Sequence, residues 1–353
     1  MHAAVMRRSV RNMMMMIVAV GLMLCSARSH RALAHAQQPA SQPPKPAATA
    51  PVPESPYNDP VVTLLEPGAE PRQTLRLKPK KGTTSAFEMI MNMKMAMSMG
   101  GMQQPAQVLP GMRMVAQMDI ADVKPNGDTA FELEYTDASL VETPGVQPMV
   151  LNMMRGKIET LKGTRASGVL NNRCMPRDVT VKVAENADPM MRQQIDQLSQ
   201  SLHQISVPLP EEPIGVGGRW RVESEMTAGG LAFKMTNEVT LKRIEGNVIT
   251  MEMAITQSAE PQDMNNPQLP PGAKVHLNSL KSSGTGTSTM DLTRIAPLAG
   301  ESKMTSDTDM TITMPTAPQP QQMTQHMEIA MKAKDTPVKP AGAAPTTQPA
   351  GRP

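Results

Sequence analysis

The stretch that decides the fold reads Phe87-Glu88-Met89-Ile90-Met91-Asn92-Met93-Lys94-Met95-Ala96-Met97-Ser98-Met99. Phenylalanine or methionine occupies every odd position, whereas most of the even positions carry polar or small residues. Because successive side chains of a β-strand point to opposite faces, a period of two predicts a strand with one methionine face and one more polar face.

The same alternation recurs along most of residues 73–334, so the whole region is predicted to be built from similar strands. Short links at Pro125–Asp128, Ala228–Gly230 and Gly246–Asn247 separate the runs, and links of this kind favour antiparallel hairpins. We therefore expect a single, mainly β domain: a large curved antiparallel sheet, half-barrel or barrel-like, with one amphipathic helix packed on it. A closed barrel or a two-layer sandwich would cover the apolar faces equally well.

The helix is expected at about residues 188–205. Asp188 can cap its amino terminus, and Pro189 suits a first turn. Apolar residues then recur at steps of four, three, four and three, at Met191, Ile195, Leu198, Leu202 and Ile205. This spacing places them in one stripe, which should pack on the sheet.

The first 36 residues are typical of a signal peptide. Arg7, Arg8 and Arg11 precede a short apolar run, and Ala34-His35-Ala36 offers a cleavage site after Ala36. The alternatives are an uncleaved anchor and a lipoprotein acylated at Cys25; Leu24, before that cysteine, disfavours the lipoprotein. We expect export to the periplasm, the cell envelope or the extracellular space. Residues 37–72 are predicted to be a disordered Pro/Ala-rich spacer, and residues 335–353 a disordered tail.

Composition narrows the choice of partners. The five arginines within residues 1–36 exceed the net charge of +3, so the remainder is slightly acidic and offers no basic patch to nucleic acid. Aromatic residues make up 2% of the chain and methionine contributes 35 residues, so the core must be largely aliphatic and thioether. Cys174 stands alone outside the signal segment. It is expected to be a small buried hydrophobe, the alternative being a disulfide between chains.

A second motif follows the expected helix: Pro208-Leu209-Pro210-Glu211-Glu212-Pro213-Ile214-Gly215-Val216-Gly217-Gly218-Arg219-Trp220. Together with Leu75-Arg76-Leu77-Lys78 near the start of the strands, it resembles an uncharacterised family of exported bacterial proteins, a domain of unknown function with a Pro-x-Pro and Val-Gly-x-x-Trp motif. The resemblance would cover about residues 73–334 and implies no activity. It also implies similarity to the half-barrel of periplasmic lipoprotein carriers, an analogy of fold alone. Physically, the glycines permit a tight turn, and Trp220 should anchor the next strand in the core.

No constellation for catalysis is evident, so we expect no enzyme, no cofactor and no metal site. His203, His276 and His326 lie far apart in the sequence and without metal-ligand spacing. Gly284-Thr285-Gly286 lacks the following helix that phosphate binding requires. Asp307 and Asp309 share a strand face, which is more typical of a solvated surface than of a cation site.

The leading hypothesis is a non-catalytic cell-envelope protein that binds lipid or another hydrophobic molecule in a methionine-lined concavity. Its expected lining is Met89, Met91, Met93, Met95, Met251 and Met253. The main alternative is a structural or interaction module with a filled core and no ligand. Two lesser alternatives are an outer-membrane β-barrel and Cu(I) handling, because thioether sulfur is a soft ligand that suits Cu(I). The sequence does not identify a protein partner.

Overall fold

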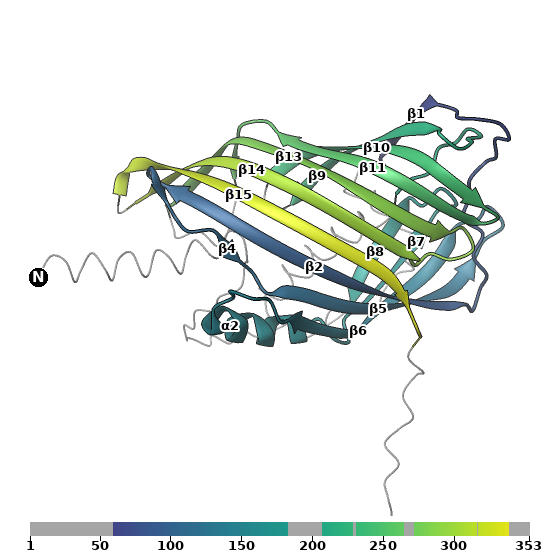
Figure 1. Cartoon of the computed structure of the whole chain (residues 1–353), viewed down its shortest axis with the longest axis horizontal. Coiled ribbons are helices and arrows are strands. Elements are labelled where there is room, and N and C mark those ends of the chain that lie inside the picture. Colours follow the sequence, from purple (N-terminus) through teal and green to yellow (C-terminus); the bar gives the residue numbers. More distant parts are fainter. Residues whose placement is uncertain (1–58, 183–206, 229–230, 265–271, 316, 339–353) are drawn as a thin grey trace, which may run out of the picture. The chain divides into compact units, whose positions relative to one another are not determined.

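The computed structural model describes residues 59–182, 207–228, 231–264, 272–315 and 317–338. All described residues belong to one compact unit. They form one antiparallel sheet of 15 strands and one short helix, which confirms the expected mainly β, antiparallel fold (Figure 1).

The elements in chain order are β1 (Val61–Glu66), β2 (Thr84–Met99), β3 (Met102–Gln103), β4 (Gln107–Val108), β5 (Gly111–Val123), β6 (Thr129–Val141), α2 (Pro148–Glu159), β7 (Arg165–Leu170), β8 (Pro176–Lys182), β9 (Arg219–Ala228), β10 (Leu231–Glu245), β11 (Val248–Ala259), β12 (Gln262–Met264), β13 (Lys274–Asp291), β14 (Ala299–Met314) and β15 (Ala317–Thr336). The main path through the sheet is β1-β9-β10-β11-β13-β14-β15-β2-β5-β6-β7-β8, and three short strands, β3, β4 and β12, pair beside it.

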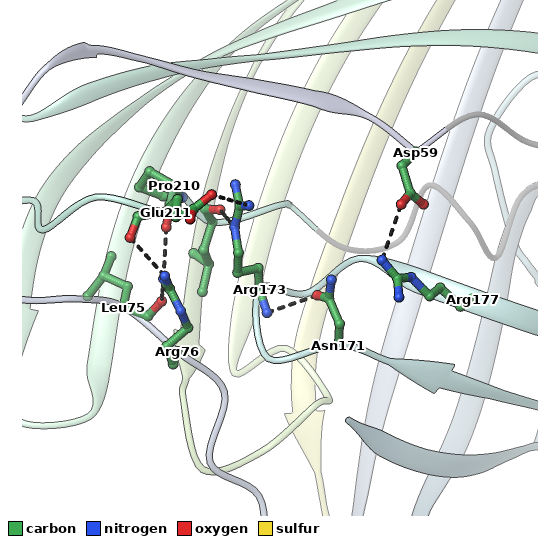
Figure 2. Close-up of polar contacts among 9 residues, drawn as sticks. Asp59, Leu75, Arg76, Asn171, Arg173, Arg177, Pro210 and Glu211 are labelled. Carbon is green, nitrogen blue, oxygen red and sulfur yellow. Dashed lines mark hydrogen bonds and ion pairs between the residues drawn. The ribbon is translucent and has the colours of Figure 1, made fainter. Parts of the chain in front are cut away.

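The sheet curls until its two edge strands approach each other, but it is not closed. Val222, next to the β1 edge, and Val181 of β8, the opposite edge strand, belong to one core cluster. Asp59, just before β1, forms an ion pair with Arg177 of β8 at 3.2 Å (Figure 2). We call the face that carries this core the inner face, and the opposite one the outer face.

The chain crosses one end of the strands in a tightly packed region, which we call the floor of the sheet. Trp220 is completely buried, and its indole nitrogen donates a hydrogen bond to the Pro208 carbonyl at 2.8 Å. Leu75, Leu209 and Ile214 are equally buried in the same core cluster. The motif from Pro208 to Trp220 therefore has the role expected from its physical reading: a turn that delivers tryptophan into the core.

Two arginines hold this crossing segment in place (Figure 2). Arg76 donates hydrogen bonds to the carbonyls of Pro210 and Glu211, both at 2.8 Å. Arg173 donates to the Leu209 carbonyl at 2.9 Å. Burial and the neighbouring Arg173 lower the pKa of Arg76, yet the guanidinium stays charged because arginine does not lose its proton in proteins. Both arginines thus satisfy backbone carbonyls that a proline-rich loop leaves without strand partners.

The outer face is charged and its charges are paired across strands. Glu88 is 8% exposed and forms ion pairs with Lys334 and Arg113. Hydrogen bonds from Lys334 and from Arg113 hold the pKa of Glu88 below its ordinary value, although burial opposes them. Similar pairs join Lys94 to Glu328. The outer face is therefore suited to contact with water.

The helix of the structure was not expected from the sequence, and the predicted one at 188–205 lies outside the described residues. α2 begins at Pro148, a favoured first helical position, and buries Met154 and Ile158. Its sequence signal is weak because the segment is short and contains Gly156, which lowers helix propensity.

The expected boundaries of the spacer and the tail were wrong at their inner ends. Val61–Glu66, inside the predicted spacer 37–72, is strand β1, which pairs with β9 and places Val62 and Leu64 against the core. At the other end, β15 continues through Thr336, two residues into the predicted tail. At β1 a short apolar run beside prolines gives little signal by itself, and at the end of β15 the polar Asp335 and Thr336 are held in the strand by pairing with Phe87 and Ala86 of β2.

Cys174 is a buried residue, as expected for a small hydrophobe. Its side chain is 2% exposed and belongs to the core cluster. Burial raises the pKa of its thiol to about 12. Because the thiolate is the reactive species, this thiol is protected from disulfide exchange while the protein is folded.

We predict that Gly215→Ala destabilises the fold much more than Gly217→Ala. A Cβ on Gly215 would overlap the Ala69 carbonyl oxygen, whereas Gly217 has open space and only a left-handed φ of 82°. The expected losses in free energy of unfolding are about 3 kcal/mol or more for overpacking at Gly215 and about 1–2 kcal/mol for backbone strain at Gly217. Urea unfolding followed by fluorescence of Trp220, the single tryptophan, measures both. Equal losses would contradict the close approach.

Candidate functional site: the methionine patch of the inner face

Methionines from distant parts of the sequence gather on the inner face. Register pairs Met89 and Met91 of β2 with Met114 and Met112 of β5. On its other side β2 pairs with β15, which sets Met91, Met95 and Met99 opposite Met331, Met327 and Met323. Since directly opposed residues have Cβ atoms about 4.5–5.5 Å apart, their side chains are in contact range. We call these residues, with Met93, Met97, Met304 and Met310, the methionine patch.

The six residues expected from the sequence lie on the inner face at different depths. Met89, Met91 and Met253 are partly buried and pack against the core cluster. Met93 is also partly buried, whereas Met95 is 3% exposed. Met251 is completely buried within the core cluster, so it is part of the floor.

The expected residues come from two regions of the sheet. Met89 to Met95 belong to β2, whereas Met251 and Met253 belong to β11, and β13, β14 and β15 lie between them. Inner positions of the intervening β13 and β14 carry small residues, at Ser282, Gly284, Gly286, Ser288, Gly300, Ser302, Ser306 and Thr308. The inner face therefore combines a thioether region over β5, β2 and β15 with a region of mostly small residues over β13 and β14, into which Met304 and Met310 of β14 extend the patch.

Among the described strand positions from β9 to β2, the inner face carries one ionised side chain, Asp335 near the end of β15, opposite Phe87, and its carboxylate is paired with Arg294. Its apolar positions are occupied by methionine and aliphatic residues, and its polar ones by serine, threonine, asparagine and glutamine. Tyr135, in the core cluster, is neutral because burial raises its pKa to about 12. Apart from that paired carboxylate, these strand positions offer no acid, base or counter-ion, so the face suits an uncharged molecule.

Sequence reasoning missed three amide side chains on this face: Asn237, Gln257 and Gln325. Gln325 is 8% exposed and donates a hydrogen bond to the Met95 sulfur at 3.1 Å. Gln257 donates to the Met235 sulfur at 3.6 Å. Each occupies an apolar phase of its strand, and a polar residue in that phase was the signal available in the sequence.

Asn237 differs from the two glutamines because its side-chain oxygen has no donor. The Oδ1 atom is buried, and within the described residues it forms no hydrogen bond. A buried acceptor without a partner costs about 1–3 kcal/mol of stability. Asn237 lies opposite Val222 on β9 and Ile255 on β11, neither of which has a donor in its side chain.

Two hollows on the outer face provide a comparison with the patch. One of about 560 Å³ is lined by charged residues including Glu252 and Glu301, which pair with Lys242 and Lys332. The other, of about 430 Å³, includes Asp307, whose carboxylate lies 2.7 Å from Nδ1 of His326. These groups already have partners on a solvated face, which agrees with the interpretation of Asp307 and Asp309 as part of a solvated surface.

No group of three or more His, Cys, Asp or Glu side chains suited to a metal ion occurs in the described part of the chain. Over the same residues, no helix has the length and apolarity needed to cross a membrane.

Comparisons with known proteins give a match to one family model and distant similarity to solved structures. Residues 154–294, from α2 to just beyond β13, match a family of unknown function, DUF6263. This match agrees with the expected resemblance to an uncharacterised family. No curated protein matches the chain. Among solved structures, the chain is weakly similar to OmpTdeltaL8, a loop L8 deletion mutant of OmpT, an outer membrane protein of Vibrio cholerae. The similarity has a TM-score of 0.18 and 9% identity over 72% of this chain and 100% of that one, too low to carry an argument.

We predict that shortening a methionine to alanine lowers the free energy of unfolding much more at the floor than in the patch. Met251→Ala should cost about 2–5 kcal/mol of unfolding free energy, because it leaves a cavity in the core. Met93→Ala, at a partly buried position outside the core cluster, should cost about 1 kcal/mol or less. Urea denaturation of the two variants measures both losses in unfolding free energy. If Met93→Ala is as costly as Met251→Ala, the patch is packed as tightly as the floor.

Proposed function

We propose that this protein is a non-catalytic, exported cell-envelope protein that holds a hydrophobic molecule, such as a lipid, on the methionine patch. The observation that carries the proposal is the convergence of methionines from β5, β2, β15 and β14 on one inner face. Export is supported by the signal-peptide pattern of residues 1–36.

Methionine suits this role better than branched side chains would. Its unbranched thioether adapts to irregular apolar surfaces, and methionine is frequent where one protein surface accepts several partners. The patch adjoins the floor, in which Trp220 and Met251 are completely buried, because Met89 and Met91 pack against the same core cluster. A deformable surface beside a fixed core can accommodate a flexible chain without unfolding the sheet.

The two faces of the sheet support this orientation. The outer face pairs its charges across strands, for example Lys94 with Glu328 and Lys332 with Glu301, so an apolar ligand gains nothing there. Strands that face lipid would instead present an apolar outward band. The inner face is therefore the better surface for an apolar molecule, with the outer face in water.

We predict that Met91→Glu/Met93→Glu abolishes binding of diphenylhexatriene, an apolar dye that fluoresces when removed from water. The two carboxylates would lie on the inner face, where no counter-ion is available and desolvation disfavours the charge. Titration of the full chain, purified from the envelope without detergent, measures the dissociation constant, and a loss of at least tenfold is expected.

The matched control is Asn92→Glu/Ser98→Glu, which adds the same charge to the outer face of the same strand. It should bind the dye like the natural chain. Unchanged binding by the inner-face variant, with circular dichroism showing an intact sheet, would overturn the proposal and leave the filled structural module as the better account.

Cu(I) handling is the second candidate, favoured by one observation. Met112, Met91 and Met331 stand in a single cross-strand row on three adjacent strands, so three thioethers are within reach of one soft ion. Retention of Cu(I) against a chelator by the natural chain, and its loss in Met91→Leu/Met331→Leu, is what this candidate requires.

A further inference from the structure

The unpartnered oxygen of Asn237 lies on the ligand side of the sheet. Asn237 alternates with Met235 and Val239, both of which are inner-face residues of β10. Its Oδ1 atom is buried and accepts no hydrogen bond within the described residues. An unmatched acceptor at an apolar position lowers the stability of the fold, so its presence is explained best by a donor that arrives with a bound molecule.

The polar groups near Asn237 on the described inner face make no hydrogen bond to its Oδ1 atom. The Gln257 amide nitrogen donates to the Met235 sulfur, and the Ser282 hydroxyl donates to Ser306 at 2.9 Å. The side chains directly opposite Asn237, those of Val222 and Ile255, contain no donor at all. Within the described residues the oxygen is an unmatched acceptor, which an external N–H or O–H group would satisfy.

Asn237 and the methionine patch lie in one row across the inner face. The row runs through Asn237, Ile255, Gly284, Met304, Ile329 and Met93. From β10 to β2 it crosses five strand intervals, about 24 Å measured along the sheet at roughly 4.8 Å per interval. An acceptor at one end and thioethers at the other match a molecule with a polar head and a long apolar chain.

We propose that the bound molecule is a neutral amphiphile whose hydroxyl or amide N–H group donates to Asn237 Oδ1 while its chain lies on the methionine patch. This inference rests on the proposed function and specifies its ligand class. The head group is uncharged, because the one ionised side chain at the described inner positions from β9 to β2, Asp335, is already paired with Arg294 and balances no further charge.

The test compares two lipids with the same acyl chain: monoolein, which has hydroxyl donors, and methyl oleate, which has none. Each displaces diphenylhexatriene from the full-length protein. The natural chain is expected to bind monoolein at least tenfold more tightly than methyl oleate. Asn237→Leu should bring this ratio close to one and leave the affinity for methyl oleate unchanged.

A second readout separates this role from a merely structural one. Asn237→Leu should raise the unfolding midpoint of the lipid-free protein, because it removes an unmatched acceptor from an apolar row. Asn92→Leu, on the outer face, is the matched control and should leave the ratio of affinities unchanged. Asn237→Met provides a second apolar replacement. It should likewise bring the ratio of affinities close to one and raise the unfolding midpoint.

Two results would overturn the inference. One is a monoolein preference that survives in Asn237→Leu and Asn237→Met; the other is a large loss of stability in both variants, which would mean that Asn237 is held by a structural partner. If neither lipid displaces the dye from the natural chain, or the dye itself does not bind, the proposed function fails together with its ligand class. Binding of both lipids with equal affinity removes only the ligand class.

Discussion

The structure depends on the burial of one face of every strand. A strand with methionine at each odd position is unfavourable if that face stays in water. Because aromatic residues are few, the face must be covered mainly by the aliphatic and methionine side chains of other strands. Curling the sheet brings the apolar faces of strands near its two edges into one cluster, as Val222 and Val181 show. The long strands, the paired charges outside and the crossing segment at the floor all follow from that requirement.

The floor and the patch use the same face differently. At the floor, Trp220 and Met251 are completely buried among aliphatic neighbours, and Arg76 and Arg173 hold the crossing loop by its carbonyls. Over the patch, Met91 and Met93 remain partly exposed. Met95, Met310 and Met323, also in the patch, are at most 3% exposed. The partly exposed thioethers therefore lie between two buried regions of the inner face.

Much of this could be predicted from the sequence, since the period of two fixes which face each residue takes once a strand exists. It placed Met89 to Met99 on one face, and glycine and asparagine marked the hairpin at Gly246–Asn247 between β10 and β11. Pairing between distant strands left no such signal. The row of Met112, Met91 and Met331 depends on which strands are neighbours, and the unmatched oxygen of Asn237 depends on what surrounds it. The helix at Pro148–Glu159 and strand β1 were missed because tertiary contacts outweigh their weak local patterns.

The most direct measurement of the central claim is native mass spectrometry of the natural protein, purified from the cell envelope without detergent. The account predicts a mass above that of the polypeptide, with a released molecule that is uncharged, carries a long apolar chain and bears a hydroxyl or amide group. A bare polypeptide mass from protein that never met detergent would contradict it, and the methionine patch would then be the packed interior of a structural module.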